Sequence, residues 1–193
     1  MDEDRAGHLV LQSAQTMALN SPWLREVVER MCARLQPSAA VLREYLMQSP
    51  IFDAARAELI ERGLQAYLDQ DPIAAASILI PQVEHVIRNL ARLNRSPTYK
   101  SRRHRNGGWM LRNIDDLLRD ERVIRALGDE GVHYLQVLFT DQRGWNLRHD
   151  ACHATLPADA YTMAMCDRIF HALLLLGLVG RTPPPERADA SRR

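Results

Sequence analysis

Residues 72–94, PIAAASILIPQVEHVIRNLARLN, carry the pattern that decides the fold class. Beyond Pro81, apolar residues recur at spacings of three and four, which places their side chains on one face of an α-helix. That face comprises Val83, Val86, Ile87, Leu90 and Leu93. The stretch therefore predicts a long helix. Because proline lacks a backbone N–H, Pro81 should kink the axis unless a new helix begins there.

The same periodicity runs through most of the chain. A helix is expected over 21–35, with Ser21 as its N-cap and Pro22 at its first position. Trp23, Val27, Met31 and Leu35 are spaced by four and should form its buried stripe. Further helical patterns cover residues 38–47, 50–70, 109–127 and 131–140. Alternation typical of strands is rare, so the predicted fold class is all-α.

The length of 193 residues suits one domain. We expect a helical domain over residues 1–180, in which additional N-terminal helices (1–71) precede a core bundle (72–180). The proline-rich tail 181–193, RTPPPERADASRR, should be disordered. Residues 96–107 should be poorly ordered as well.

Charge and composition exclude several function classes. The net charge of +1 gives the whole molecule no strong attraction to polyanions, so any such contact must be local. Three cysteines without CxxC spacing suggest neither a disulfide framework nor a four-cysteine zinc site. The N-terminus MDEDRAGHLV lacks the pattern of a signal sequence, and the most apolar run, residues 169–180, is too short for a bilayer. We expect a cytoplasmic protein without a membrane segment, metal or cofactor.

The concentrated positive charge lies in residues 95–108, RSPTYKSRRHRNGG, which are predicted to form a loop. Its cations are candidates for binding the phosphates of a nucleic acid, although a solvated surface loop has the same composition. These residues are Arg95, Lys100, Arg102, Arg103 and Arg105, with Tyr99 among them.

Residues 147–154, LRHDACHA, form the most polar cluster and follow the turn 141–146, DQRGWN. Asn146 is a good N-cap for a helix that begins here. On such a helix, Arg148 and His153 are about 140° apart and about 7.5 Å apart along the axis. Long side chains could then converge on one groove, and His149 and His153 share a face.

Three interpretations of this cluster stay open on the residues alone. Two histidines spaced by four are zinc-ligand geometry, but Cys152 points away from them and no further ligand is marked. Polar residues are also common in the first turn of an ordinary surface helix. The third interpretation is catalytic, because an imidazole can take a proton from an alcohol and a guanidinium can stabilise charge on a phosphoryl group.

The segment RHDACH, residues 148–153, resembles the Rx4-6H motif of the HEPN-domain ribonucleases, which are all-α proteins. Residues 76–178 are also similar in layout to the HEPN subgroup of bacterial phage-defence and toxin-like proteins and the ER-membrane-associated RNA degradation protein. A motif carries weight when its predicted structural context is present. The resemblance implies a metal-independent endoribonuclease acting on RNA as a homodimer, with a HEPN-like helical bundle.

The resemblance also implies roles for individual residues. His153 would act as general base or acid, Arg148 would hold the scissile phosphate, and His149 would assist by hydrogen bonding. Asp150 would be structural or orient a neighbour. Glu84 and Arg88 would border the groove or form a structural ion pair at their spacing of four, along a helix face shared with Arg92.

Control by a partner and a noncatalytic role remain alternatives. HEPN toxins neutralised by a nucleotidyltransferase tend to carry a tyrosine two residues past the histidine, but this chain has Thr155 there and its next tyrosine is Tyr161. An antitoxin or regulatory protein of another kind stays open. So does a HEPN-like module that binds RNA or a protein without cleavage. A small-molecule pocket has no Gly-rich phosphate loop or nucleophile motif to support it.

Overall fold

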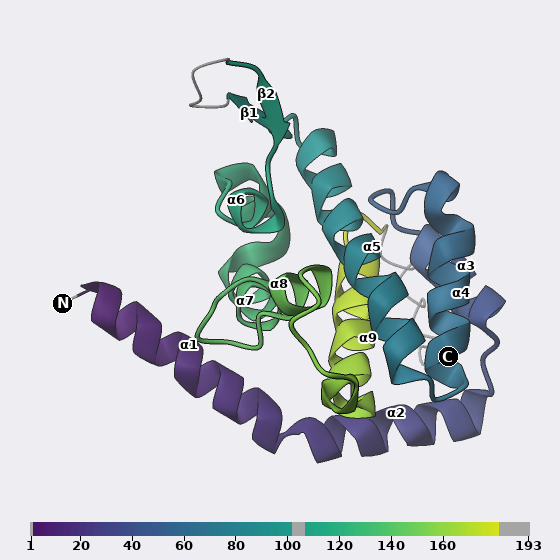
Figure 1. Cartoon of the computed structure of the whole chain (residues 1–193). Coiled ribbons are helices and arrows are strands. Elements are labelled where there is room, and N and C mark those ends of the chain that lie inside the picture. The colour runs from purple at the N-terminus through teal and green to yellow at the C-terminus, as the bar shows by residue number, and fades with distance from the viewer. Residues whose placement is uncertain (1, 102–106, 182–193) are drawn as a thin grey trace, which may run out of the picture.

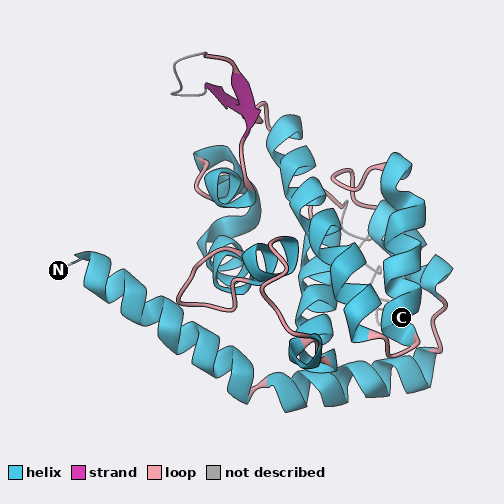
Figure 2. Ribbon diagram, viewed as in Figure 1, coloured by secondary structure: helices cyan, strands magenta, loops and turns pink. Residues whose placement is uncertain are grey.

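The computed structural model describes residues 2–101 and 107–181, and these fold mainly into helices around one hydrophobic core (Figure 1). Figure 2 shows the helices in cyan and the single hairpin in magenta. The all-α prediction is therefore confirmed. The helices are α1 (Asp2–Leu19), α2 (Ser21–Leu35), α3 (Ala39–Met47), α4 (Ala57–Leu68), α5 (Pro72–Leu93), α6 (Ile114–Leu118), α7 (Glu121–Phe139), α8 (Leu147–Cys152) and α9 (Met163–Gly177). Two 3₁₀ turns, Ala54–Arg56 and Ala158–Ala160, and the strands β1 (Tyr99–Ser101) and β2 (Trp109–Leu111) complete the described part. The predicted disorder of 182–193 concerns residues outside it.

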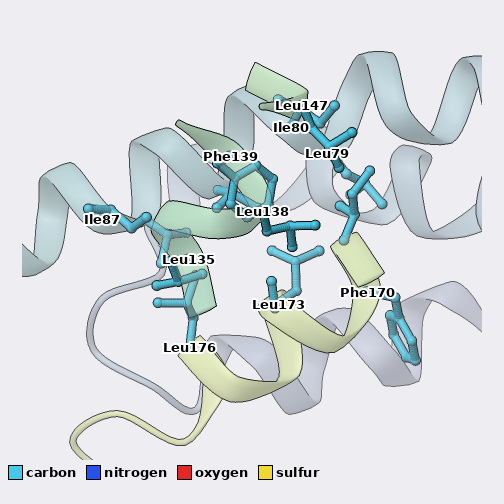
Figure 3. Close-up of a cluster of buried hydrophobic side chains, with 14 of the residues drawn as sticks. Leu79, Ile80, Ile87, Leu135, Leu138, Phe139, Leu147, Phe170, Leu173 and Leu176 are labelled. Atoms are coloured by element: carbon cyan, nitrogen blue, oxygen red, sulfur yellow. The ribbon is translucent and has the colours of Figure 1, made fainter. Parts of the chain in front are cut away.

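Helix α5 is the central element, because α4, α6, α7, α8 and α9 all pack against it. Asp71 caps its N-terminus by accepting a hydrogen bond from Ala74 N at 3.0 Å, and Pro72 occupies its first turn. Figure 3 shows side chains from α5, α7 and α9 meeting in the core, where Leu79, Leu138 and Leu173 are fully buried. The long predicted helix thus provides the surface on which the others assemble.

Pro81 lies inside α5, so no new helix begins there. A proline at this position withholds one backbone donor from the preceding turn. The side chain of Gln82 donates from Nε2 to the carbonyl of Ile78 at 3.3 Å, which adds a hydrogen bond within that turn. The helix continues through the proline, and of its predicted apolar face Val83, Val86, Ile87 and Leu90 are buried whereas Leu93 is 48% exposed.

The predicted buried stripe of the 21–35 helix is wrong for three of its four residues, and only Met31 is half-buried and packs against the core. Trp23 is 74% exposed and Leu35 is 66% exposed, and Val27 is exposed as well. Figure 1 shows α2 along one side of the body and α1 extending from it as an arm, and α2 packs on α9 through another face, which includes the buried Val28. Asn20, not Ser21, is the N-cap. The spacing places these side chains on one face, but it does not say which face meets a neighbour.

Residues 95–108 were predicted to form a loop, but residues 99–101 form the first strand of a short hairpin. Residues 109–111, predicted to begin a helix, form the second strand of that hairpin. Antiparallel β1 and β2 pair Tyr99 with Leu111 and Ser101 with Trp109. Strands of three residues are too short to show an alternating pattern in sequence. The helix predicted over 50–70 is shorter than expected. A 3₁₀ turn comes first, and α4 begins at Ala57. Arg102, Arg103 and Arg105 lie outside the described residues.

Candidate functional site

The turn over residues 141–146 fixes helix α8 against the end of α7. Trp145 N donates to Val137 O at 2.8 Å, and the Trp145 indole Nε1 donates to Ala14 O of α1 at 3.3 Å. A Cβ on Gly144 would lie 2.2 Å from Val137 O, so only glycine allows this approach of the two backbones. Leu147 then buries its side chain in the core. Arg148 and His149 are therefore held by a tightly packed segment.

Both ends of α8 place non-glycine residues in the left-handed region. Asn146 is the N-cap, as predicted, but its φ is 49° and its side chain caps nothing. Ala154, just past the C-terminus, has a φ of 53°. This conformation costs an alanine roughly 1–2 kcal/mol, and such strain often gathers at functional sites. Thr155 stabilises the end of the helix by donating from N and Oγ1 to Asp150 O at 3.0 and 3.2 Å.

Asp150 has a structural role in this arrangement. Its Oδ1 accepts a second hydrogen bond from Thr155 Oγ1 at 3.2 Å, within the same short helix end. Its carboxylate is thus engaged with the turn that ends α8. The structural alternative for Asp150 agrees with this contact.

Glu84 on α5 joins two arginines. Its Oε2 accepts a hydrogen bond from Arg148 Nε at 2.9 Å, and its Oε1 accepts one from Arg88 Nη2 at 2.6 Å. The Glu84–Arg88 ion pair expected from their spacing of four is confirmed. All three side chains are largely shielded from solvent, which strengthens their attraction over that of an exposed pair. Arg148 is therefore held at its Nε, and no hydrogen bond of its two Nη atoms is found within the described chain.

The two histidines of the motif lie side by side. The ring centroids of His149 and His153 are 4.5 Å apart with the planes at 47°. His153 is the C-cap of α8 and donates from its backbone N to His149 O at 3.0 Å, so the helix ends one residue before it. Both side chains are exposed. The shared face expected for these residues is confirmed, and it is open to solvent.

A small polar hollow of about 120 Å³ lies where α6, α7 and α8 meet. Arg148 and His149 line it together with residues from the other two helices, whereas His153 lies beside His149 outside the lining. The other lining residues are Asn113, Ile114, Asp115, Phe139, Thr140, Gln142 and Asn146.

Sequence reasoning missed the contribution of α6 to this hollow. Asn113 begins α6 with a reciprocal capping box, in which its side chain accepts from Asp116 N and the Asp116 carboxylate accepts from Asn113 N. The Asn-x-x-Asp spacing of this cap is visible in the sequence. Only the fold shows that the cap stands opposite Arg148.

The predicted phosphate-binding residues that the structure describes each contact a different partner, and they do not form one cluster. Lys100 on β1 forms an ion pair with Asp116, and Arg95 has a left-handed backbone whose carbonyl accepts a hydrogen bond from Arg122. Arg88 reaches from α5 to donate from Nη1 to Arg112 O at 2.6 Å. The site and the base of the hairpin are thus connected through Arg88, and Arg148, Glu84, Arg88 and Arg112 form one hydrogen-bonded series.

A larger hollow of about 770 Å³ lies elsewhere, between α7 and the end of α9. His171 Nδ1 and Tyr134 Oη are 2.9 Å apart at its wall. Burial, and secondarily the charge of Arg168, lowers the pKa of His171, and burial raises the pKa of Tyr134 to about 12. These shifts favour a neutral pair. The lining of this hollow includes Asp129 and Glu130, whose negative charge would repel a phosphate, and none of the described residues that line it is an arginine.

In residues 2–101 and 107–181, no group of three or more His, Cys, Asp or Glu side chains could hold a metal ion. None of the described helices combines the length and apolar character needed to cross a bilayer. Comparisons with protein-family models, curated proteins and solved structures give no match.

Proposed function

We propose that this chain is a metal-independent endoribonuclease of the HEPN type, with Arg148 and His153 as its central catalytic residues. The observation that supports the proposal most is the placement of Arg148. Glu84 holds it through Nε at 2.9 Å, and Arg148 lines one hollow with His149, whose ring lies 4.5 Å from that of His153 between centroids. A positioned guanidinium can stabilise charge on a phosphate and an exposed imidazole can transfer a proton, and cleavage of RNA without a metal uses both functions.

The chemistry follows from these groups. His153 takes the proton from a ribose 2′-hydroxyl, whose oxygen attacks the adjacent phosphorus. Arg148 binds the nonbridging oxygens and stabilises the added negative charge. The P–O5′ bond breaks, a protonated His153 from a second protomer donates its proton to the leaving 5′-oxygen, and the products end in a 2′,3′-cyclic phosphate and a 5′-hydroxyl. His149 assists by hydrogen bonding to the phosphate.

The proposed active form is a homodimer. The attacking and leaving oxygens of an in-line displacement stand on opposite sides of the phosphorus. His149 and His153 are only 4.5 Å apart between ring centroids, so together they can serve one side of the phosphate. A second protomer related by twofold symmetry would bring its own Arg148 and His153 to the other side.

The resemblance of the motif suggests a biological setting for this activity. We propose that the chain acts in the cytoplasm as a toxin or phage-defence effector and that RNA is its substrate. An antitoxin or other regulatory protein would then restrain it.

One observation favours a second candidate, a noncatalytic HEPN-like module that binds RNA or a protein. The Glu84 carboxylate offsets part of the positive charge of Arg148 and would weaken the binding of a phosphate by this arginine. A cleavage assay separates the two candidates, because the module would leave RNA intact.

The test is digestion of one single-stranded RNA by the purified chain with and without EDTA, followed by mass spectrometry of the product ends. Cleavage that survives EDTA and leaves cyclic phosphates is expected, and an all-deoxy strand should stay intact. Arg148→Ala should remove the activity. Arg62→Ala, which breaks an exposed ion pair with Glu58 on α4, is the matched control and should leave it unchanged. Chelator-sensitive cleavage or cleavage of DNA would refute the proposal.

A further inference from the structure

One face of the β1–β2 hairpin is apolar and uncovered. Directly paired residues of antiparallel strands point to the same side, so Tyr99, Ser101, Trp109 and Leu111 share this face. Trp109 is 75% exposed, Tyr99 54% and Leu111 48%. Figure 1 shows the hairpin projecting beyond the helices at one end of the body. The described chain leaves the rings and the leucine side chain open to solvent.

The base of the hairpin is firmly held, although a free two-stranded hairpin is only marginally stable. Arg112, the residue after β2, donates from Nη1 to Pro97 O and to Asp120 Oδ2, both at 2.8 Å. Burial opposes ionisation of Asp120, but hydrogen bonds from Ser96 and Arg112 lower its pKa to about 2. The Asp120 carboxylate thus remains charged and keeps Arg112 in place. These contacts present the aromatic face in a fixed orientation.

The sequence around this face is strongly basic. Residues 95–112 contain 6 of the 25 lysines and arginines of the chain and none of its 24 acidic residues. Asp116 and Asp120 offset the charges of Lys100 and Arg112, and the other four cations leave the segment with a positive charge that attracts a polyanion. The same charge opposes the packing of a second copy on this face, because twofold symmetry would bring two like-charged segments together.

The hairpin is also joined to the α8 site. Leu111 ends β2, and Asn113, two residues later, already lines the hollow that contains Arg148 and His149. Arg88 links the two regions directly, because it bonds both to Glu84 and to Arg112 O. A strand that leaves the α8 site along α6 would therefore pass onto the hairpin.

We infer that the face formed by Tyr99, Trp109 and Leu111 is a stacking platform for unpaired nucleobases of single-stranded RNA whose backbone passes the α8 site. The inference deepens the proposed ribonuclease function and rests on it for the identity of the nucleic acid. Aromatic side chains stack on any base, whereas bases inside a duplex are already stacked on one another. The platform thus selects unpaired RNA with little dependence on sequence.

The experiment measures binding without cleavage. The probe is a fluorescently labelled 2′-O-methyl oligoadenylate of about 12 nucleotides, which lacks the attacking hydroxyl, and its affinity for the full chain is read by anisotropy. An abasic oligomer with the same phosphates and a duplex of the same length are the competitors. We expect the chain to bind the single strand about tenfold or more tightly than either competitor, because stacking is lost in both.

Variants test the platform itself. Trp109→Ala should weaken binding of the oligoadenylate about tenfold or more. The affinity of this variant for the abasic oligomer should equal that of the unaltered protein. Trp109→Phe should retain most of the affinity, since an aromatic ring remains. Trp23→Ala is the matched control, because Trp23 on α2 is 74% exposed and lies on a different element. Circular dichroism checks that each variant keeps its helical content.

The outcomes separate this inference from the proposed function. Equal binding of the oligoadenylate and the abasic oligomer, or an unchanged affinity of Trp109→Ala, overturns the platform even if the chain cleaves RNA. Loss of a dimer in Trp109→Ala by light scattering, without loss of RNA affinity, would also overturn it. Base-dependent binding lost in Trp109→Ala supports the platform, and it does so even if no RNA is cleaved and the ribonuclease proposal fails.

Discussion

Glu84 accepts a hydrogen bond from Arg148 Nε at 2.9 Å and thereby joins the central helix α5 to the short helix α8. A carboxylate at Nε fixes the plane of the guanidinium and directs its remaining N–H groups. The contact leaves the arginine both oriented and partly neutralised. Whether orientation or neutralisation dominates decides what the site does with a phosphate.

Replacement of Glu84 tests this balance. If Glu84 is a positioning residue, Glu84→Ala should lower kcat about tenfold or more without raising KM, because a small misplacement of a catalytic group is costly. Glu84→Gln keeps an acceptor for Arg148 Nε and should recover part of kcat. Steady-state kinetics on a single-stranded RNA provide both constants. Glu58→Ala, at an exposed pair, is the control, and an unchanged kcat in Glu84→Ala would contradict the role.

The two histidines should differ in their effect on cleavage. His153→Ala should reduce the rate about 100-fold or more, the scale for removing a general base, and His149→Ala should cost less. Single-turnover cleavage of a labelled RNA measures both rates. His8→Ala, an exposed histidine on α1, should leave the rate unchanged. A larger loss in His149→Ala than in His153→Ala would reverse the assignment of their roles.

Gly144→Ala should misplace α8 and destabilise the protein. The added Cβ would lie 2.2 Å from Val137 O, so the backbone must shift, at a cost of about 2 kcal/mol or more. Urea denaturation followed by circular dichroism measures the loss, and cleavage should fall with it. Gly131→Ala is the control, because its Cβ would meet nothing nearer than Leu127 Cβ at 3.6 Å. Equal stability of the two variants would show that the close approach is unimportant.

Tyr67→Phe should weaken the core beneath α9. The Tyr67 hydroxyl donates to the buried Asp167 Oδ1 at 2.6 Å, and Arg25 Nη1 reaches the same oxygen at 3.1 Å. Loss of a hydrogen bond to a buried charge costs about 2 kcal/mol. Tyr45→Phe keeps the ring that lies under Arg181 and should change the free energy of unfolding little. Similar urea midpoints for the two variants would contradict the prediction.

Acid should destabilise the protein through two histidines. Burial lowers the pKa of His85 and of His171, with the charges of Arg56 and Arg168 as the next causes. In the unfolded chain these histidines take up protons from about pH 6.5 downward. The folded protein does so only at lower pH. Their stabilising contribution is therefore complete above about pH 6.5 and is lost as the pH falls through the folded-state values.

The measurement is the free energy of unfolding in urea at pH 7.5 and pH 5. We expect it to fall toward pH 5, and His171→Gln should reduce the size of that fall. Asp120 does not contribute to this fall, because its stabilising effect is present above its unfolded-state pKa of about 3.9 and is lost only as the pH drops toward its folded-state pKa of about 2. His8→Gln, at an exposed position on α1, is the control for the substitution itself. An equal pH dependence in His171→Gln and the unaltered protein would exclude His171 as a cause.

The sequence by itself determined the features that depend on neighbours along the chain. Spacings of three and four gave the helices, and hence the all-α class, because they reflect the helical repeat. The Glu84–Arg88 pair was predictable for the same reason, and so was the shared face of His149 and His153. Asn146 marked the start of α8 through its preference for the N-cap, although its left-handed backbone was not foreseen.

Only the tertiary structure decided which faces and segments meet. The apolar row of Trp23, Val27 and Leu35 was visible in the sequence, but its exposure follows from α9 packing against another side of α2. Glu84 reaches Arg148 because α8 packs on α5, and Tyr99 pairs with Leu111 through a strand register that no periodicity encodes. Local spacing constrains a side chain to one face of its own element. The partner of that face is set by the packing of the whole core.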